Sequence, residues 1–229
     1  MFRIRNNTLI MFAVCCIIAM TLHAQNTKGV DAEIKVKFEL KYKDWENYFN
    51  SQQFHLSSDS SGVDTKYFSE LVDLGTPALS FIMEKMEKDT KIFSVFRRIT
   101  KKWFSKVEIS DVQYDYYKLY KTWWDGGYKK TPELLEEYYP KWQDAIREGK
   151  AEEAETLFRK IRDLGIIIMP ALFEKIKMGD YSSLPILEHL TEKKISADEV
   201  NKISDKVKKK EYCLDWWNKN KSTYLINFQ

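Results

Sequence analysis

Cysteine is scarce in this sequence, with three residues in 229. Two of them, Cys15 and Cys16, lie in an N-terminal stretch that we expect to be cleaved, which leaves Cys213 alone. A single cysteine cannot form an internal disulfide, so packing must stabilise the fold. Because Cys213 is followed by Leu214 and two tryptophans, we predict a small buried apolar residue rather than a reactive thiol.

The sequence also lacks the short motifs that carry familiar catalytic or metal chemistry. It has no HExxH, no later pair of cysteines, no Gly-x-Ser-x-Gly and no glycine-rich phosphate loop. Only His55 and His189 follow residue 24, and we interpret His189 as a structural or surface residue. We therefore predict no catalytic residue, no metal ligand and no cofactor.

Acidic residues do occur in pairs, such as Asp111/Asp115 and Glu133/Glu137. A glycosidase needs two carboxylates roughly 5–9 Å apart in a cleft, but the i,i+4 spacing on any charged helix gives a similar distance. Because 31% of the residues are charged, we interpret these pairs as solvated helix faces.

Residues 1–24 have the features of a secretory signal peptide. Two arginines precede an apolar run over residues 9–22, and the small Ala24 stands at the expected cleavage position. An uncleaved anchor fits less well, because the run is shorter than the ~20 residues of a membrane span. A lipoprotein also fits less well, because Val14 rather than a small residue precedes Cys15. We expect an exported protein, periplasmic or secreted, with no membrane span after cleavage.

The charge balance points to no polyanionic partner. Removing 24 residues and their two arginines from 229 residues and a net charge of +3 leaves 205 residues and a charge of +1. A nearly neutral chain gives no argument for binding nucleic acid or an anionic membrane.

An internal repeat is the most informative pattern in the chain. Residues 68–86 align without a gap with residues 158–176, and six of nineteen positions are identical. The identical pairs are Phe68/Phe158, Asp73/Asp163, Leu74/Leu164, Gly75/Gly165, Glu84/Glu174 and Lys85/Lys175. Such self-similarity predicts a repeat architecture, and repeat architectures mostly bind partners.

Helical periodicity predicts a mainly all-α fold. The predicted segments are a signal peptide (1–24), an N-terminal arm, helix and polar loop (25–65, with the loop at 56–64), a first repeat (66–104), an aromatic-rich helical insert (105–150), a second repeat (151–195), and C-terminal capping helices with a tail (196–229). Prolines at helix starts and glycines at helix ends support this division. Pro140 is expected to kink or split the helix that contains it.

One segment is ambiguous between strand and helix. Apolar and charged residues alternate over 32–42, the period of a strand, yet Ile34, Phe38 and Tyr42 also share a helical face. We favour a strand or extended arm to Tyr42 and a helix over 44–54. The strand would pair with a second one over 223–228.

The insert supplies the candidate binding residues. Its aromatic side chains cover more of a helix circumference than one buried stripe needs, so some should reach the surface. Tryptophan and tyrosine are favoured in sugar stacking and as interface anchors, although packing between repeats is the competing interpretation. The candidates are Tyr120, Trp123, Trp124, Tyr128 and Trp142, of which Trp124, Tyr128 and Trp142 are expected at the surface.

The repeated turn resembles that of HEAT-like repeats, including the short bacterial type related to phycobilisome-lyase repeats. The first copy has Leu74-Gly75, Thr76 and then Pro77-Ala78-Leu79; the second has Leu164-Gly165, four residues and then Pro170-Ala171-Leu172. The resemblance covers 66–103, 151–194 and the Trp-Trp tail helix, under half of the cleaved chain. It implies an α-helical binding scaffold without catalytic residues. The copies are not contiguous and their spacing to proline differs, so a compact bundle of helical hairpins fits as well as a regular solenoid.

These observations together predict an exported, non-catalytic binding module. The expected partner is an envelope or extracellular protein. The alternatives are a polysaccharide of the cell wall, held by exposed Trp and Tyr, and an enzyme acting on envelope polymers.

Overall fold

The computed structural model describes residues 32–51 and 65–228, which belong to two compact units, residues 1–59 and 60–229. The predicted signal peptide (1–24) and polar loop (56–64) lie outside the described residues. Within the described part, no helix has both the length and the apolar character needed to cross a bilayer.

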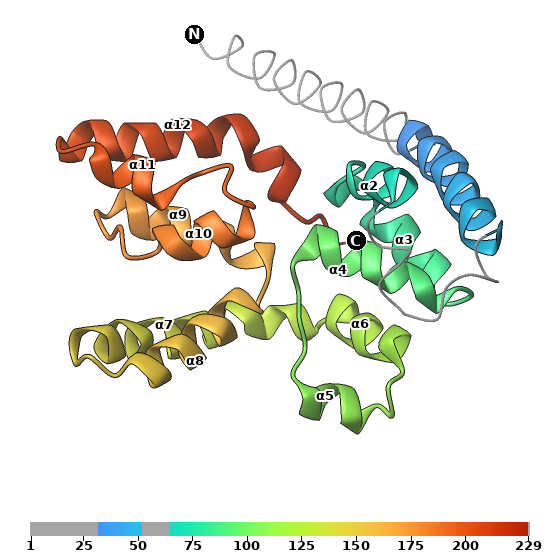
Figure 1. Ribbon diagram of the computed structural model, residues 1–229, viewed down its shortest axis with the longest axis horizontal. Helices are drawn as coiled ribbons and strands as arrows, with labels where there is room; N and C mark the ends of the chain where they lie inside the picture. The colour runs from blue at the N-terminus through green and yellow to red at the C-terminus, as the bar shows by residue number, and fades with distance from the viewer. Residues whose placement is uncertain (1–31, 52–64, 229) are drawn as a thin grey trace, which may run out of the picture. The chain divides into compact units, whose positions relative to one another are not determined.

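In the first unit, residues 32–51 form a helix (Figure 1), so the predicted strand over 32–42 is wrong. Ring contacts run along one helical face from Phe38 to Tyr42 and on to Trp45, with centroids 6.0 Å and 5.9 Å apart. Val36 and Leu40, which the strand pattern would place with Phe38, are exposed. The spacing of three and four residues between the large aromatic side chains therefore outweighs the two-residue alternation.

The described part of the second unit is built from α-helices and short 3-10 turns, without a strand, and confirms the all-α prediction (Figure 1). The α-helices are α2 (Lys66–Val72), α3 (Leu79–Met86), α4 (Phe93–Thr100), α5 (Lys106–Asp111), α6 (Tyr116–Asp125), α7 (Thr131–Arg147), α8 (Ala151–Arg162), α9 (Met169–Lys177), α10 (Leu184–Leu190), α11 (Ala197–Lys202) and α12 (Lys206–Tyr224). The 3-10 turns are η1 (Thr76–Ala78), η2 (Thr90–Ile92), η3 (Gly127–Lys130) and η4 (Ile166–Ile168).

The predicted strand over 223–228 is also wrong. The helix α12 continues to Tyr224, and the Leu225 N–H still donates to the Lys221 carbonyl (2.9 Å). A strand needs a partner for its backbone groups, and its expected partner, residues 32–42, is helical.

The two repeat copies adopt the same local structure, α2–η1–α3–α4 and α8–η4–α9–α10. Three residues after each first helix ends stands a glycine with a left-handed φ, +67° at Gly75 and +85° at Gly165. Glycine adopts this conformation without the steric cost that a side chain would bring. A 3-10 turn follows in both copies and leads into the second helix.

The turn of the second copy packs tightly on the first copy. A Cβ at Gly165 would lie 2.5 Å from the Thr100 carbonyl oxygen, at the end of α4. Beside it, the Trp103 N–H donates to the Asp163 carbonyl (3.1 Å). A Cβ at Gly75, by contrast, would meet nothing in the described part of the chain closer than the ring of Pro77, two residues on, at 3.7 Å. The close approach at Gly165 thus fixes the second copy against the end of α4.

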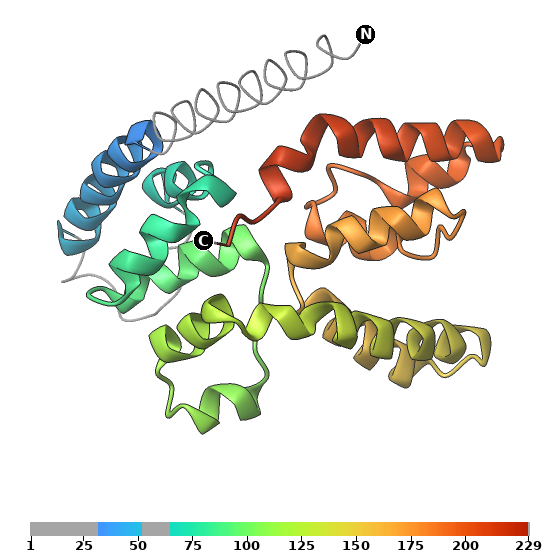
Figure 2. The ribbon, with the colours of Figure 1, turned by 180° about the vertical axis from the view of Figure 1, so that it is seen from behind.

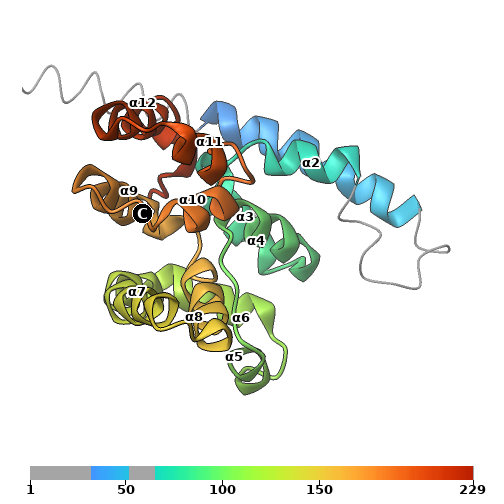
Figure 3. The same cartoon turned by 60° about the vertical axis from the view of Figure 1, so that its left-hand side comes forward.

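The insert begins with α5 and α6 and ends in the long helix α7. The helices α7 and α8 lie side by side as a hairpin in each view (Figures 1, 2 and 3). Pro140 does not split α7, which runs unbroken from Thr131 to Arg147. Because Pro140 is exposed, water can reach the carbonyl group that its missing N–H leaves unpaired.

The last helix covers the second copy. Residues of α12 contact α9, and the two helices lie next to each other in Figure 3. The ring of Trp217 stacks on Phe173 with centroids 4.6 Å apart. Cys213 on the same helix is fully buried in the apolar cluster of this half. This burial confirms the prediction of a small buried apolar residue, and it raises the pKa of the thiol to about 11.

Candidate functional site

Three of the five candidate aromatic residues are buried. Tyr120, Trp123 and Trp142 have exposed fractions of 2%, 5% and 4%. The expectation that Trp142 lies at the surface is therefore wrong. Its ring packs between Tyr139 and Phe158, with centroid distances of 5.6 Å and 5.9 Å, where α7 meets α8.

The other two candidates, Trp124 and Tyr128, are half-buried. The ring of Phe228, in the C-terminal tail, stacks on Tyr128 with centroids 3.6 Å apart and planes 3° apart. It also contacts Trp124 at 5.1 Å and Trp123 at 5.7 Å. The C-terminal tail therefore covers the aromatic residues of the insert that were predicted to bind a ligand.

Tyr120 supports a different surface. Its hydroxyl donates to the Lys102 carbonyl (3.2 Å), and its ring makes edge contacts with Phe96 and Phe104. Burial raises the pKa of this phenol well above its ordinary value. Tyr120 thus fixes the backbone on both sides of Trp103.

Trp103 lies at a groove of about 860 Å³ that sequence reasoning missed. The walls come from equivalent helices of the two copies, α2 and α4 on one side and α8 and α10 on the other, with the residues that follow α4 and α10. The lining residues are Phe68, Ser94, Arg97, Arg98, Lys101, Trp103, Phe158, Pro185, Glu188, His189, Glu192 and Lys193. The identical pair Phe68/Phe158 of the repeat contributes a ring from each copy.

The backbone is strained where the two copies meet at the groove. Lys101, Glu192 and Lys193 have left-handed φ values of 54°, 54° and 65°. Such a conformation costs a residue with a side chain about 1–3 kcal/mol and occurs often at functional sites. A buried threonine stands at the end of each of the helices α4 and α10. The Thr100 hydroxyl donates to the Phe96 carbonyl (2.9 Å), and the Thr191 hydroxyl donates to the Leu187 carbonyl (2.8 Å).

An ion pair joins the two helix ends. The Glu192 carboxylate binds Lys101 and, at 3.1 Å, Arg98. Burial alone would raise the pKa of Glu192, but the hydrogen bond from Lys101 and the charge of Arg98 hold it below its usual range. Burial lowers the pKa of Lys101 despite this partner. Burial also lowers the pKa of His189, and the charges of Arg162 and Lys101 lower it further.

Arg97 differs from the other cations at the groove. Its guanidinium carbon lies 4.2 Å from the ring centroid of Trp103 and 5.4 Å from that of Phe93. Among the described residues, no carboxylate lies within ion-pair distance of Arg97. The indole of Trp103 is 44% exposed. A fixed, uncompensated guanidinium therefore stands beside an exposed tryptophan.

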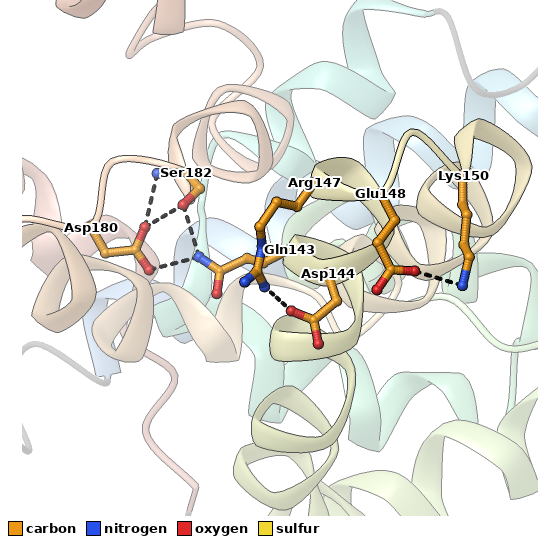
Figure 4. Close-up of polar contacts among 7 residues, drawn as sticks. All are labelled: Gln143, Asp144, Arg147, Glu148, Lys150, Asp180 and Ser182. Carbon is orange, nitrogen blue, oxygen red and sulfur yellow. Dashed lines mark hydrogen bonds and ion pairs between the residues drawn. The ribbon is translucent and has the colours of Figure 1, made fainter.

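A second polar cluster lies where α7 meets the turn between α9 and α10 (Figure 4). The Asp180 carboxylate accepts from Gln143 Nε2 (3.1 Å), from the Tyr139 hydroxyl (3.0 Å) and from the Ser182 N–H (3.0 Å). Burial would raise the pKa of Asp180, but these donors and the Ser182 hydroxyl hold it below its ordinary value. We interpret this cluster as structural, because its members satisfy one another. Beside it in Figure 4, Arg147 pairs with Asp144, and Lys150 with Glu148 at 2.7 Å, on the exposed end of the α7–α8 hairpin.

Nothing in the described part of the chain groups three or more His, Cys, Asp or Glu side chains as metal ligands. Comparison with protein-family models, with curated proteins and with solved structures finds no match for this chain. The groove is therefore the basis on which a function is proposed.

Proposed function

We propose that this chain is an exported, non-catalytic binding module, whose HEAT-like helical repeats hold an envelope or extracellular protein in the groove between the two copies. The observation that carries the proposal is the exposed Trp103 beside Arg97, which has no ion-pair partner among the described residues. Tryptophan and arginine are the residues most enriched among those that dominate binding energy at protein interfaces.

The scaffold around this pair is fixed before any partner arrives. Gly165 packs against the end of α4, Tyr120 holds the Lys102 carbonyl, and Lys101 is paired with Glu192. A surface held in this way loses little conformational entropy on binding, which favours affinity. The HEAT-like assignment is supported by the shared helix, glycine turn, 3-10 turn and helix of the two copies.

The polysaccharide alternative depended on an open aromatic surface in the insert. Phe228 covers Tyr128 and contacts Trp124, and the remaining candidates are buried. The groove has one exposed indole and several cations, which suits a protein partner better than a neutral glycan.

A pull-down with the chain from Gln25 onward, on envelope extract of the source cell, tests this function. We expect one stoichiometric protein that is retained by the wild type and lost with Trp103→Ala. Tyr212→Ala is the matched control, because Tyr212 is a comparably exposed aromatic residue (41%) on α12, outside the groove lining. Equal capture by wild type and Trp103→Ala would refute binding at the groove.

A further inference from the structure

The groove carries an excess of positive charge. Arg97, Arg98, Lys101 and Lys193 line it, against the carboxylates of Glu188 and Glu192. Glu192 is already shared between Lys101 and Arg98. Burial lowers the pKa of His189, and the charges of Arg162 and Lys101 lower it further. A ligand that brings negative charge would therefore complement the groove.

Arg97 is the cation best placed to receive that charge. Aromatic rings of Phe93 and Trp103 hold its guanidinium, and it has no carboxylate partner among the described residues. Rings that contact the guanidinium leave its N–H edges available, and those edges match a carboxylate with two parallel hydrogen bonds. Lys193 is exposed at the groove and likewise lacks an ion-pair partner within the described ranges.

The walls of the groove also present apolar surface. Phe158, Pro185 and the indole of Trp103 supply this surface, whereas Phe68 lines the groove but is buried. Apolar surface between cations suits a chain in which acidic and apolar side chains lie next to each other. A polymer of uronic acids would supply the charge but no apolar side chains.

We propose that the groove binds an acidic, extended segment of a protein partner, with one carboxylate paired to Arg97 and a neighbouring apolar side chain packed against Trp103. This inference rests on the proposed function and names the chemistry of the partner. Extended segments with alternating side chains present one set to a groove and the other to solvent.

Fluorescence anisotropy with defined probes tests it. The main probe is a fluorescein-labelled decapeptide of alternating Glu and Leu. A Lys–Leu peptide tests the sign of the charge, an all-Glu peptide tests the apolar contribution, and oligogalacturonate tests the polysaccharide alternative. We expect saturable binding of the Glu–Leu peptide, weaker binding of the all-Glu peptide, and no binding of the Lys–Leu peptide. Raising the salt from about 50 mM to about 300 mM should weaken binding by screening the charges.

Two variants locate the binding. Arg97→Gln should weaken Glu–Leu binding about tenfold or more, because one charge-assisted pair is lost. Lys193→Gln changes only an exposed side chain and should weaken it by a smaller factor. Arg147→Gln is the matched control, since Arg147 is an exposed arginine on α7 that pairs with Asp144 away from the groove. Circular dichroism and thermal melting confirm that each variant is folded.

Absence of Glu–Leu binding, or equal affinity for wild type and Arg97→Gln, overturns the inference, as does a preference for oligogalacturonate. The pull-down separates this result from the proposed function through Ser94→Trp, which places a large ring in the groove. A partner lost with Ser94→Trp but retained with Arg97→Gln leaves the binding module intact and overturns the acidic segment. A partner retained by both variants binds outside the groove, which overturns both the acidic segment and the proposed binding at the groove.

Discussion

Lys101 and Glu192 occupy corresponding positions in the two repeat copies and form an ion pair with each other. Each follows a buried threonine at the end of the third helix, and each has a φ of 54°. The same position thus carries opposite charges in the two copies, at the place where the copies meet beside the groove. This contact joins the ends of α4 and α10 at the groove.

The stability of the fold should depend on pH through two groups at the groove, His189 and Glu192. The pKa of His189 lies below its ordinary 6.5 in the folded chain, so the unfolded chain takes up a proton first and stability falls as the pH drops below about 6.5. The pKa of Glu192 lies below 4.5, so the stability it contributes above that pH is lost as the pH falls further. Melting temperatures from pH 7.5 to pH 3 should decline in both ranges. His189→Gln should flatten the first decline and Glu192→Gln the second; unchanged profiles would contradict the assignment.

Alanine at the two repeat glycines should have unequal effects. Gly165→Ala combines a left-handed backbone with a Cβ that would lie 2.5 Å from the Thr100 carbonyl oxygen. Gly75→Ala has the backbone cost alone, about 1–3 kcal/mol at φ 67° and ψ −160°. Denaturant unfolding should show Gly165→Ala to be the more destabilising by at least about 1–3 kcal/mol, the usual cost of overpacking. Similar losses at both sites would mean that the end of α4 can move aside.

Removing the ring of Phe228 should uncover the aromatic surface of the insert. Phe228→Ala should increase acrylamide quenching of tryptophan fluorescence, because Trp124 and Tyr128 lose their cover. Loss of the stacked pair should cost about 0.5–1.5 kcal/mol beyond the area buried. Leu225→Ala is the control, since Leu225 is in the same tail and 45% exposed. Equal quenching in both variants would place the tail away from the tryptophans.

The Asp180 cluster should stabilise the fold through Tyr139. Tyr139→Phe removes one hydrogen bond and should lower the free energy of unfolding by about 1 kcal/mol. Asp180→Ala removes the carboxylate that accepts from the Tyr139 hydroxyl, Gln143 and the Ser182 N–H, and should lower it by about 1–3 kcal/mol. A double-mutant cycle measured by denaturant unfolding should give a coupling energy between the two positions. Strict additivity would show that the hydrogen bond contributes nothing.

Cys213 should resist labelling in the folded protein. Its side chain is buried and its pKa is raised to about 11, so little thiolate is present at pH 8. Ellman's reagent should react slowly with the native chain and rapidly in guanidinium chloride. Fast labelling of the native chain would show that α12 opens readily.

The sequence predicted those features that depend on neighbouring residues. The repeated turn at Gly75 and Gly165 and the all-α class follow from local spacing and were confirmed. The strand prediction for residues 32–42 is wrong because apolar and charged residues alternate there as they do in a strand. The large aromatic side chains recur every three to four residues, and their ring contacts favour the helix. Trp142 was expected at the surface because a count of rings on one helix does not show which helix will pack against it.

The groove could not be predicted, because its walls come from segments about 90 residues apart. Arg97 and Trp103 stand in the run Arg-Arg-Ile-Thr-Lys-Lys-Trp, where four cations without a nearby acidic residue are the one available signal. That signal gives no indication of the second wall, which α8 and α10 supply.

The hydrogen bond between Trp103 and Asp163 has a consequence for how this chain could be rebuilt. The backbone leaves the first copy at Trp103 and comes back to it at Asp163, so everything between forms an excursion with adjoining ends. Most of this excursion cannot be exchanged, because Tyr120 holds the Lys102 carbonyl and α8 supplies a wall of the groove. The turn between α7 and α8 is exposed over residues 146–150, and a Cβ at Gly149 would meet no described atom within 4 Å. A segment inserted in that turn would leave both anchor points in place, so the turn is a natural place to carry a foreign domain.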